Sequence, residues 1–140
     1  MNFLLDTNVI SEWTKPRPNG GVVQWLSDAH EDRLFLSVVT IAELRHGVER
    51  LPPGARKARL GNWVSEAVPA RFEGRVLPIE VEIATTWGRM MARARLCGRV
   101  LSIMDGFMAA TAQRHEMTLV TRNVADFEAL EVRLLNPWTG

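Results

Sequence analysis

The sequence has no tyrosine, a single cysteine and no long hydrophobic run, and each absence excludes a class of chemistry or of location. Without tyrosine, no catalytic mechanism can use a phenol. Cys97 cannot form an internal disulfide and has no partner in a spaced metal-binding motif, so we expect a structural role, since free cysteine behaves as a small hydrophobe. No apolar run approaches the ~20 residues that span a bilayer, and the N-terminus lacks the features of a signal peptide. We therefore expect a cytoplasmic protein with no membrane contact.

Lysine is scarce as well, because 15 of the 17 basic residues are arginine. Arginine is the side chain best suited to bidentate phosphate contacts, although a high-GC coding bias would produce the same excess. The net charge of +1 does not distinguish between classes of partner. With 140 residues, 46% of them hydrophobic, the chain is long enough to bury one sizeable core. We predict a single domain over residues 1–140.

Short apolar runs alternate with helical patterns along the chain. The predicted strands are Phe3–Leu5, Arg33–Val39, Arg75–Ile79, Thr118–Thr121 and Val132–Leu135. The predicted helices are Thr7–Trp13, Val22–Ala29, Thr40–Leu51, Ala55–Val68, Val81–Leu96, Ser102–Glu116 and Val124–Leu130. Pro78 places the third strand at a sheet edge, because proline cannot donate to a strand ladder. The alternation predicts an α/β fold with a mostly parallel sheet and helices on both faces.

Asp6 directly follows the first buried strand, Phe3–Leu5. Its carboxylate therefore lies at the carboxyl end of a central strand, where open α/β sheets hold their ligands. Thr7 and Asn8 then favour a turn and a helix start, so Asp6 is equally well explained as the cap of the next helix. Asp6 becomes a candidate functional residue only if other acids reach the same edge.

Three further acids, Glu43, Asp105 and Asp126, each come three residues after a small polar residue. Each has the form of a capping box or a close variant, so capping is the simpler explanation for any one of them. Together they favour a site, because Glu43 and Asp126 come just after strands and Asp105 begins an apolar helix without an obvious cationic partner. Clustered carboxylates repel until a cation neutralises them, and oxygen ligands favour Mg²⁺ or Mn²⁺ over Zn²⁺.

Four stretches carry a family resemblance in order and spacing: Leu4-Leu-Asp6-Thr-Asn-Val-Ile-Ser11, Thr40-Ile-Ala-Glu43-Leu-Arg-His-Gly47, Met104-Asp105-Gly-Phe-Met-Ala-Ala-Thr-Ala112 and Val120-Thr-Arg-Asn-Val-Ala-Asp126-Phe127. With these motifs the chain resembles PIN-domain ribonucleases, most closely the VapC-type toxins of bacterial toxin–antitoxin pairs and their FitB-like branch. The resemblance runs from Asn2 to the C-terminus. It implies a three-layer α/β/α fold with a central sheet of four to five strands.

The resemblance also implies an activity, a site and partners. The activity is metal-dependent hydrolysis of RNA phosphodiester bonds, with tRNA or another structured RNA as the substrate. Asp6, Glu43 and Asp105 would hold Mg²⁺ or Mn²⁺. Thr7, Asn8, Thr121 and Asn123 would support the acids or contact phosphate. The implied partners are a small antitoxin and a second copy of the chain, as a homodimer or a larger assembly with antitoxin.

The fourth acid departs from the family pattern. Many PIN domains carry it two residues after the threonine that ends the strand, and here that position is Asn123. Asp126, three residues further on, is the acid that this chain offers instead. It would bind a second ion or orient a water molecule.

An acid-free stretch from Ile83 to Met104 contains four arginines, Arg89, Arg93, Arg95 and Arg99. We predict that they contact the RNA backbone, since the acids themselves would repel it. A solvated helix face explains them equally well. His46 lies within a turn of Glu43, but an unpartnered histidine more often has a surface or packing role than a catalytic one.

Two other functions are compatible with the acids. A haloacid-dehalogenase-like phosphatase would need a second acid where Asn8 stands and a lysine near the later acids, and Lys15 and Lys57 are predicted to lie far from them. An inactive PIN-fold binding module would use all the acids as helix caps. In a VapC-like protein, Trp13, Trp25 and Trp63 could serve contacts with the antitoxin or the second copy, although packing in the core is the commoner role of tryptophan.

Overall fold

The computed structural model describes residues 1–139, and its centre is a five-stranded sheet. The strands are β1 (Phe3–Leu5), β2 (Leu34–Ser37), β3 (Val76–Leu77), β4 (Thr118–Val120) and β5 (Leu134–Leu135). Their order is β3-β2-β1-β4-β5 and every pair is parallel. The predicted parallel α/β sheet is confirmed, and β3 is an edge strand, as Pro78 indicated.

Eight α-helices accompany the sheet in residues 1–139. They are α1 (Thr7–Ile10), α2 (Gly20–Asp28), α3 (Val38–Glu49), α4 (Ala55–Asn62), α5 (Val68–Arg71), α6 (Val81–Leu96), α7 (Ile103–Arg114) and α8 (Val124–Phe127). A 3₁₀ turn, η1 (Ser11–Thr14), extends α1, and η2 (Glu31–Arg33) precedes β2. None of the helices described is long and apolar enough to cross a membrane.

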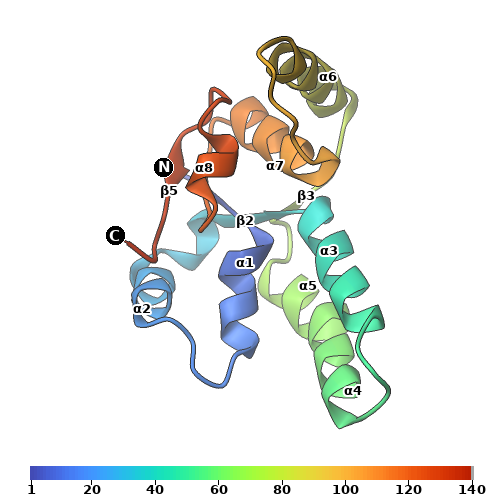
Figure 1. Ribbon diagram of the computed structural model, residues 1–140. Helices are drawn as coiled ribbons and strands as arrows, with labels where there is room; N and C mark the ends of the chain where they lie inside the picture. The colour runs from blue at the N-terminus through green and yellow to red at the C-terminus, as the bar shows by residue number, and fades with distance from the viewer. Residues whose placement is uncertain (140) are drawn as a thin grey trace.

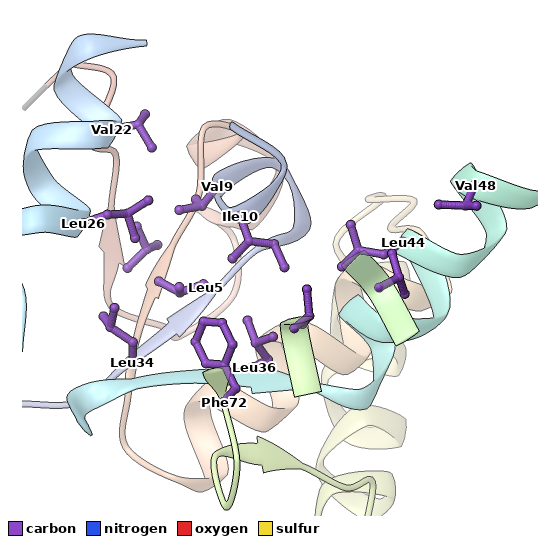
Figure 2. Close-up of a cluster of buried hydrophobic side chains, with 13 residues drawn as sticks. Leu5, Val9, Ile10, Val22, Leu26, Leu34, Leu36, Leu44, Val48 and Phe72 are labelled. Atoms are coloured by element: carbon purple, nitrogen blue, oxygen red, sulfur yellow. The ribbon is translucent and has the colours of Figure 1, made fainter. Parts of the chain in front are cut away.

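The helices form a layer on each face of the sheet, which confirms the three-layer architecture. In Figure 1, α6, α7 and α8 lie on one side of the sheet and α1 to α5 on the other. The two faces of β1 supply different cores, since Leu5 packs with α1, α2 and α3 whereas Leu4 packs with α6 and α7. Figure 2 shows the first core, where Phe72 sits among leucines of β1 and β2. Trp13, Trp25 and Trp63 pack against this core, as the packing alternative predicted.

The predicted helix Ala55–Val68 is instead interrupted. Trp63–Ala67 forms a π-helical segment, η3, between α4 and α5. Pro69 stands in the first turn of α5 and has no N–H to donate to the carbonyl four residues earlier. The loss of that bond explains why the regular pattern changes just before Pro69.

Cys97 is exposed, so it does not pack as a small hydrophobe in the core. It is the C-cap residue of α6, which ends at Leu96, and Gly98 follows with a positive φ. The sequence pattern did not show that this last turn projects beyond the core.

Gly106 fixes how α7 approaches α6. A Cβ atom there would lie 2.6 Å from the sulfur of Met91 and 2.8 Å from Nε1 of Trp87. Trp87 also stacks on Phe107, with ring centroids 4.9 Å apart. Because Asp105 immediately precedes this glycine, the close packing of the two helices determines where its carboxylate lies.

Candidate active site

Asp6 is both a helix cap and part of a cluster of acids. It follows β1 and its backbone N–H donates to the carbonyl of Val120 on β4 (2.9 Å). One carboxylate oxygen accepts from the N–H of Thr7 (2.7 Å), and the other accepts from the hydroxyl of Thr121 (2.7 Å). The two roles proposed from the sequence are therefore compatible in one side chain.

The charged form of Asp6 is disfavoured in the folded protein. The residue is 6% exposed, and this burial is the main cause that raises its pKa from 3.8 to about 6. The hydrogen bonds from Thr121 and Thr7 lower the pKa in part, while the charges of Asp105 and Glu43 raise it further. The hydrogen bonds alone would lower the pKa of Asp6, so its raised pKa reflects burial first and the neighbouring acids second.

Glu43 is not part of a capping box. Helix α3 begins at Val38, because the side chain of Ser37 caps it by accepting from the N–H of Val39 (3.1 Å). Glu43 therefore lies in the second turn, and its expected position next to the helix start is wrong. Its carboxylate instead accepts from the hydroxyl of Thr7 (2.7 Å). Thr7 thus contacts two of the predicted acids, through its N–H and its hydroxyl.

Asp105 lies in the first turn of α7, where the Ser102 hydroxyl accepts from its backbone N–H (3.0 Å). Burial raises the pKa of Asp105, the nearby Ser102 hydroxyl lowers it, and the charge of Asp126 raises it. The carboxylate is half-buried in spite of this cost. Capping of α7 by Ser102 and a role for the Asp105 carboxylate are again compatible.

Two adjoining hollows collect the predicted residues. The first, of about 390 Å³, is lined by Asp6, Thr7, Asn8, Ser11, Glu12, Lys15, Glu43, Asp105, Arg122, Asn123 and Trp138. The second, of about 460 Å³, is lined by Arg99, Val100, Leu101, Ser102, Asp105, Ala125 and Asp126. We call them the acid hollow and the Asp126 hollow. Asp105 belongs to both, so its side chain forms the boundary between them.

The structure separates the two candidates for the fourth functional residue. Asn123 lines the acid hollow with Asp6, Glu43 and Asp105, whereas Asp126 lies across Asp105 in the other hollow. Asn123 precedes α8 but makes no side-chain capping bond. Its backbone N–H donates to the Thr121 hydroxyl (3.0 Å), which itself donates to Asp6. Asp126 therefore does not line the acid hollow with the other three acids, and its role stays a prediction.

The donors of the acid hollow suit a hard divalent cation, since they are carboxylate, amide and hydroxyl oxygens without a histidine or cysteine. The geometry is less tight than the sequence predicted. Across residues 1–139, no three His, Cys, Asp or Glu side chains stand close enough to hold one ion as they are now placed. Hydrogen bonds restrain Asp6 and Glu43, and like charges oppose closer approach. Coordination of a shared ion requires these side chains to move closer together.

The four predicted arginines do not line one common hollow. Arg99 lines the Asp126 hollow beside two of the acids. Arg93 lines a separate hollow of about 100 Å³ that also contains Met90, Cys97 and Gln113. Arg89 and Arg95 are exposed on α6. The placement of Arg99 is the one that supports contact with a phosphate near the acids.

Five residues of the acid hollow were not predicted as site residues: Ser11, Glu12, Lys15, Arg122 and Trp138. The prediction that Lys15 lies far from the acids is therefore wrong. Lys15 forms an ion pair with Glu12, whose carboxylate also accepts from the N–H of Asn19 (2.8 Å). Arg122 could have been found in the motif around Thr121, but nothing in the sequence indicates that Trp138 returns to this site.

Comparison with known proteins agrees with the architecture. A model of the PIN domain family matches residues 3–132. Toxin FitB of Neisseria gonorrhoeae is 39% identical over 136 residues, which cover 97% of this chain and 98% of the relative. VapC ribonuclease Y4jK of Sinorhizobium fredii is 38% identical over 136 residues, 97% of either chain. The solved structure of FitAB bound to a DNA fragment superposes with a TM-score of 0.91 at 39% identity and covers 97% of this chain and 95% of that one.

Proposed function

The chain belongs to the PIN domain family, and from this premise we propose that it is a metal-dependent endoribonuclease and the toxin of a bacterial toxin–antitoxin pair. The observation that carries the proposal is the convergence of Asp6, Glu43 and Asp105, which come from distant segments, on one hollow. An inactive module with acids used only as caps would not require them to meet.

The raised pKa of Asp6 also supports a metal-binding role for this residue. Its buried, charge-surrounded carboxylate reduces stability at neutral pH, because its pKa is raised to about 6. Asparagine would cap α1 equally well without that cost. An acid kept where a neutral cap would be more stable fits a requirement for negative charge, as a hard cation demands.

We propose that Asp6, Glu43 and Asp105 hold Mg²⁺ or Mn²⁺, with Asp126 as a further ligand or water-orienting group. A bound divalent ion supplies the charge that activates water and neutralises phosphate oxygens. Thr7 and Thr121 orient the two carboxylates that they contact. Asn8 accepts from the N–H of Arg122 (3.4 Å) and so connects α1 to the segment after β4.

The proposed partners follow from the relatives. FitAB, and VapBC of Rickettsia felis and Salmonella typhimurium, were each solved bound to DNA. We propose that this chain likewise binds a small antitoxin and assembles as a homodimer or a larger complex. A relative from Shigella flexneri is named as a tRNA(fMet)-specific endonuclease at 26% identity, which supports a structured RNA such as tRNA as the substrate. A cytoplasmic location, where such RNA is found, stays a prediction.

The test is RNA cleavage by the purified chain with Mn²⁺ and with EDTA. Wild-type protein should cleave a mixed tRNA pool only with Mn²⁺. Glu43→Gln should cleave at least ~100-fold more slowly, because it loses a charge from the acid hollow. Glu73→Gln removes the same charge from an exposed position and should cleave like wild type. Equal cleavage in EDTA, or full activity of Glu43→Gln, would refute the proposed chemistry.

A haloacid-dehalogenase-like phosphatase is the weaker alternative. Lys15 does reach the acid hollow, but it is paired with Glu12, and Asn8 occupies the place of the second acid which that chemistry needs. Release of inorganic phosphate from a small phosphomonoester, without RNA cleavage, would favour it.

A further inference from the structure

Arg122 and Trp138 form a distinct feature at the wall of the acid hollow. The guanidinium of Arg122 lies over the indole of Trp138, 5.5 Å from the ring centroid. Arg122 is exposed and Trp138 is half-buried. Both residues line the hollow that contains Asp6, Glu43 and Asp105. A cation and an aromatic face thus stand beside the proposed reaction centre.

Hydrogen bonds hold the two residues at fixed positions relative to the acids. Arg122 follows Thr121, whose hydroxyl donates to Asp6. The carbonyl of Arg122 accepts from the side-chain amide of Asn136 (3.4 Å), and the oxygen of that amide accepts from the N–H of Trp138 (2.9 Å). The backbone of the pair is therefore braced without using the guanidinium or the indole N–H.

The charge of Arg122 is available to a ligand. Lys15, the other cation of the hollow, is already paired with Glu12. In residues 1–139, by contrast, no carboxylate lies within ion-pair distance of the Arg122 guanidinium, and no hydrogen bond from it is found. Its longer-range field still acts on Glu12. A structural brace would use these donors, whereas a phosphate contact requires them to be open.

The hollows around the pair adjoin one another, because neighbouring hollows share a lining residue. Trp138 also lines a third hollow, of about 400 Å³, together with Gly21, Gln24, Trp25 and Asp28. The acid hollow therefore shares Trp138 with this third hollow and Asp105 with the Asp126 hollow, where Arg99 lies. Arg99 and Arg122 therefore line hollows that meet at Asp105, and Trp138 supplies an aromatic face beside Arg122.

We propose that Arg122 and Trp138 form a nucleotide subsite for single-stranded RNA, in which the guanidinium binds a phosphate next to the cleaved one and the indole stacks on a base. The proposal rests on the proposed ribonuclease function. Single-stranded RNA suits this pair, because its phosphates bind cationic side chains and its bases stack on aromatic ones. The strand then passes from the Arg99 side, across the acids, to Trp138.

The test measures RNA binding separately from cleavage. Binding of a labelled single-stranded RNA oligonucleotide is followed by fluorescence anisotropy in EDTA, over a series of salt concentrations. Arg122→Ala should reduce the slope of log K against log salt by about 0.7, the loss of one phosphate contact. Trp138→Leu should weaken binding roughly 5- to 150-fold, whereas Trp138→Phe should retain most of the affinity because it keeps an aromatic face.

Arg114→Ala is the matched control, because Arg114 is an exposed cation in the last turn of α7. It should leave the salt slope within error of wild type. Arg122→Ala behaving like this control, or Trp138→Leu binding like wild type, would overturn the subsite. Equal losses of RNA affinity in Trp138→Phe and Trp138→Leu, with equally lowered melting temperatures, would also overturn the subsite. The pair would then have a purely structural role. The ribonuclease function is tested separately, by the cleavage assay: it fails if wild-type protein shows no Mn²⁺-dependent cleavage.

Discussion

Replacing Asp6 with asparagine should separate catalysis from capping, because the two roles predict opposite consequences. Asparagine has the size and the capping ability of aspartate, so the bond from the Thr7 N–H can persist. The replacement removes the charge that a cation needs and relieves repulsion from Glu43 and Asp105. We expect a protein that is at least as stable as wild type without metal but inactive with it.

The magnitude follows from the pKa of Asp6. Burial raises the pKa of this carboxyl from 3.8 to about 6. At neutral pH this corresponds to at most ~3 kcal/mol of lost stability from ionised Asp6. The gain in the variant should be smaller, about 1–3 kcal/mol, since the amide replaces one accepting oxygen beside the Thr121 hydroxyl. The expected rise in melting temperature in EDTA is roughly 3–10 °C.

The assay combines thermal melts with RNA cleavage. Wild type should gain about 2.7 kcal/mol of stability at a Mn²⁺ concentration of ~100 times the dissociation constant, and the variant should gain far less. Cleavage by the variant should fall at least ~100-fold. Asp32→Asn, which removes an exposed charge, should behave like wild type in both measurements. Full Mn²⁺-dependent cleavage by Asp6→Asn would refute the role assigned to this acid.

Two further predictions concern pH and salt. Because the folded-state pKa of Asp6 is raised, its favourable contribution to stability is complete below 3.8 and is lost as the pH rises through about 6. In EDTA, the melting temperature of wild type should therefore approach that of Asp6→Asn as the pH falls from 7 to 5. Stabilisation of wild type by Mn²⁺ should weaken over the same range. A difference in melting temperature between the two proteins that does not change with pH would contradict this prediction. Arg99→Ala should lower the salt slope of RNA binding by about 0.7, whereas Arg93→Ala should change it less, since Arg93 lines a separate hollow. An equal change of the salt slope in Arg99→Ala and Arg93→Ala would show that RNA binding does not depend on whether the arginine lies beside the acids.

Local pattern was a good guide to the elements and a poorer guide to their ends. Helix α6 has the predicted bounds, Val81–Leu96, because an uninterrupted helical period is bounded by clear signals. Helix α3 begins earlier than predicted, since the β-branched residues Val38 and Val39 resemble a strand while Ser37 provides the cap. Capping bonds of this kind depend on side-chain rotation, which composition and period do not determine.

The candidate site was predictable to a similar degree. Asp6, Glu43, Asp105 and Asp126 could be chosen from their positions after strands and at helix starts, and all four line the two adjoining hollows. That Asp105 forms the boundary between the hollows could not be predicted. Its position depends on the close approach of α7 to α6 at Gly106, a contact between separate helices.

The sequence by itself determined that this is a parallel α/β protein and that Asp6 directly follows its first strand, because both follow from periodicity and from the order of residues along the chain. Only the tertiary structure decided which side chains meet. The strand order β3-β2-β1-β4-β5 places β1 beside β4, so Asp6 reaches Thr121 from 115 positions away. The segment after β5 then returns Trp138 to the same hollow. Such contacts depend on how crossovers arrange the strands, and a one-dimensional pattern does not carry that information.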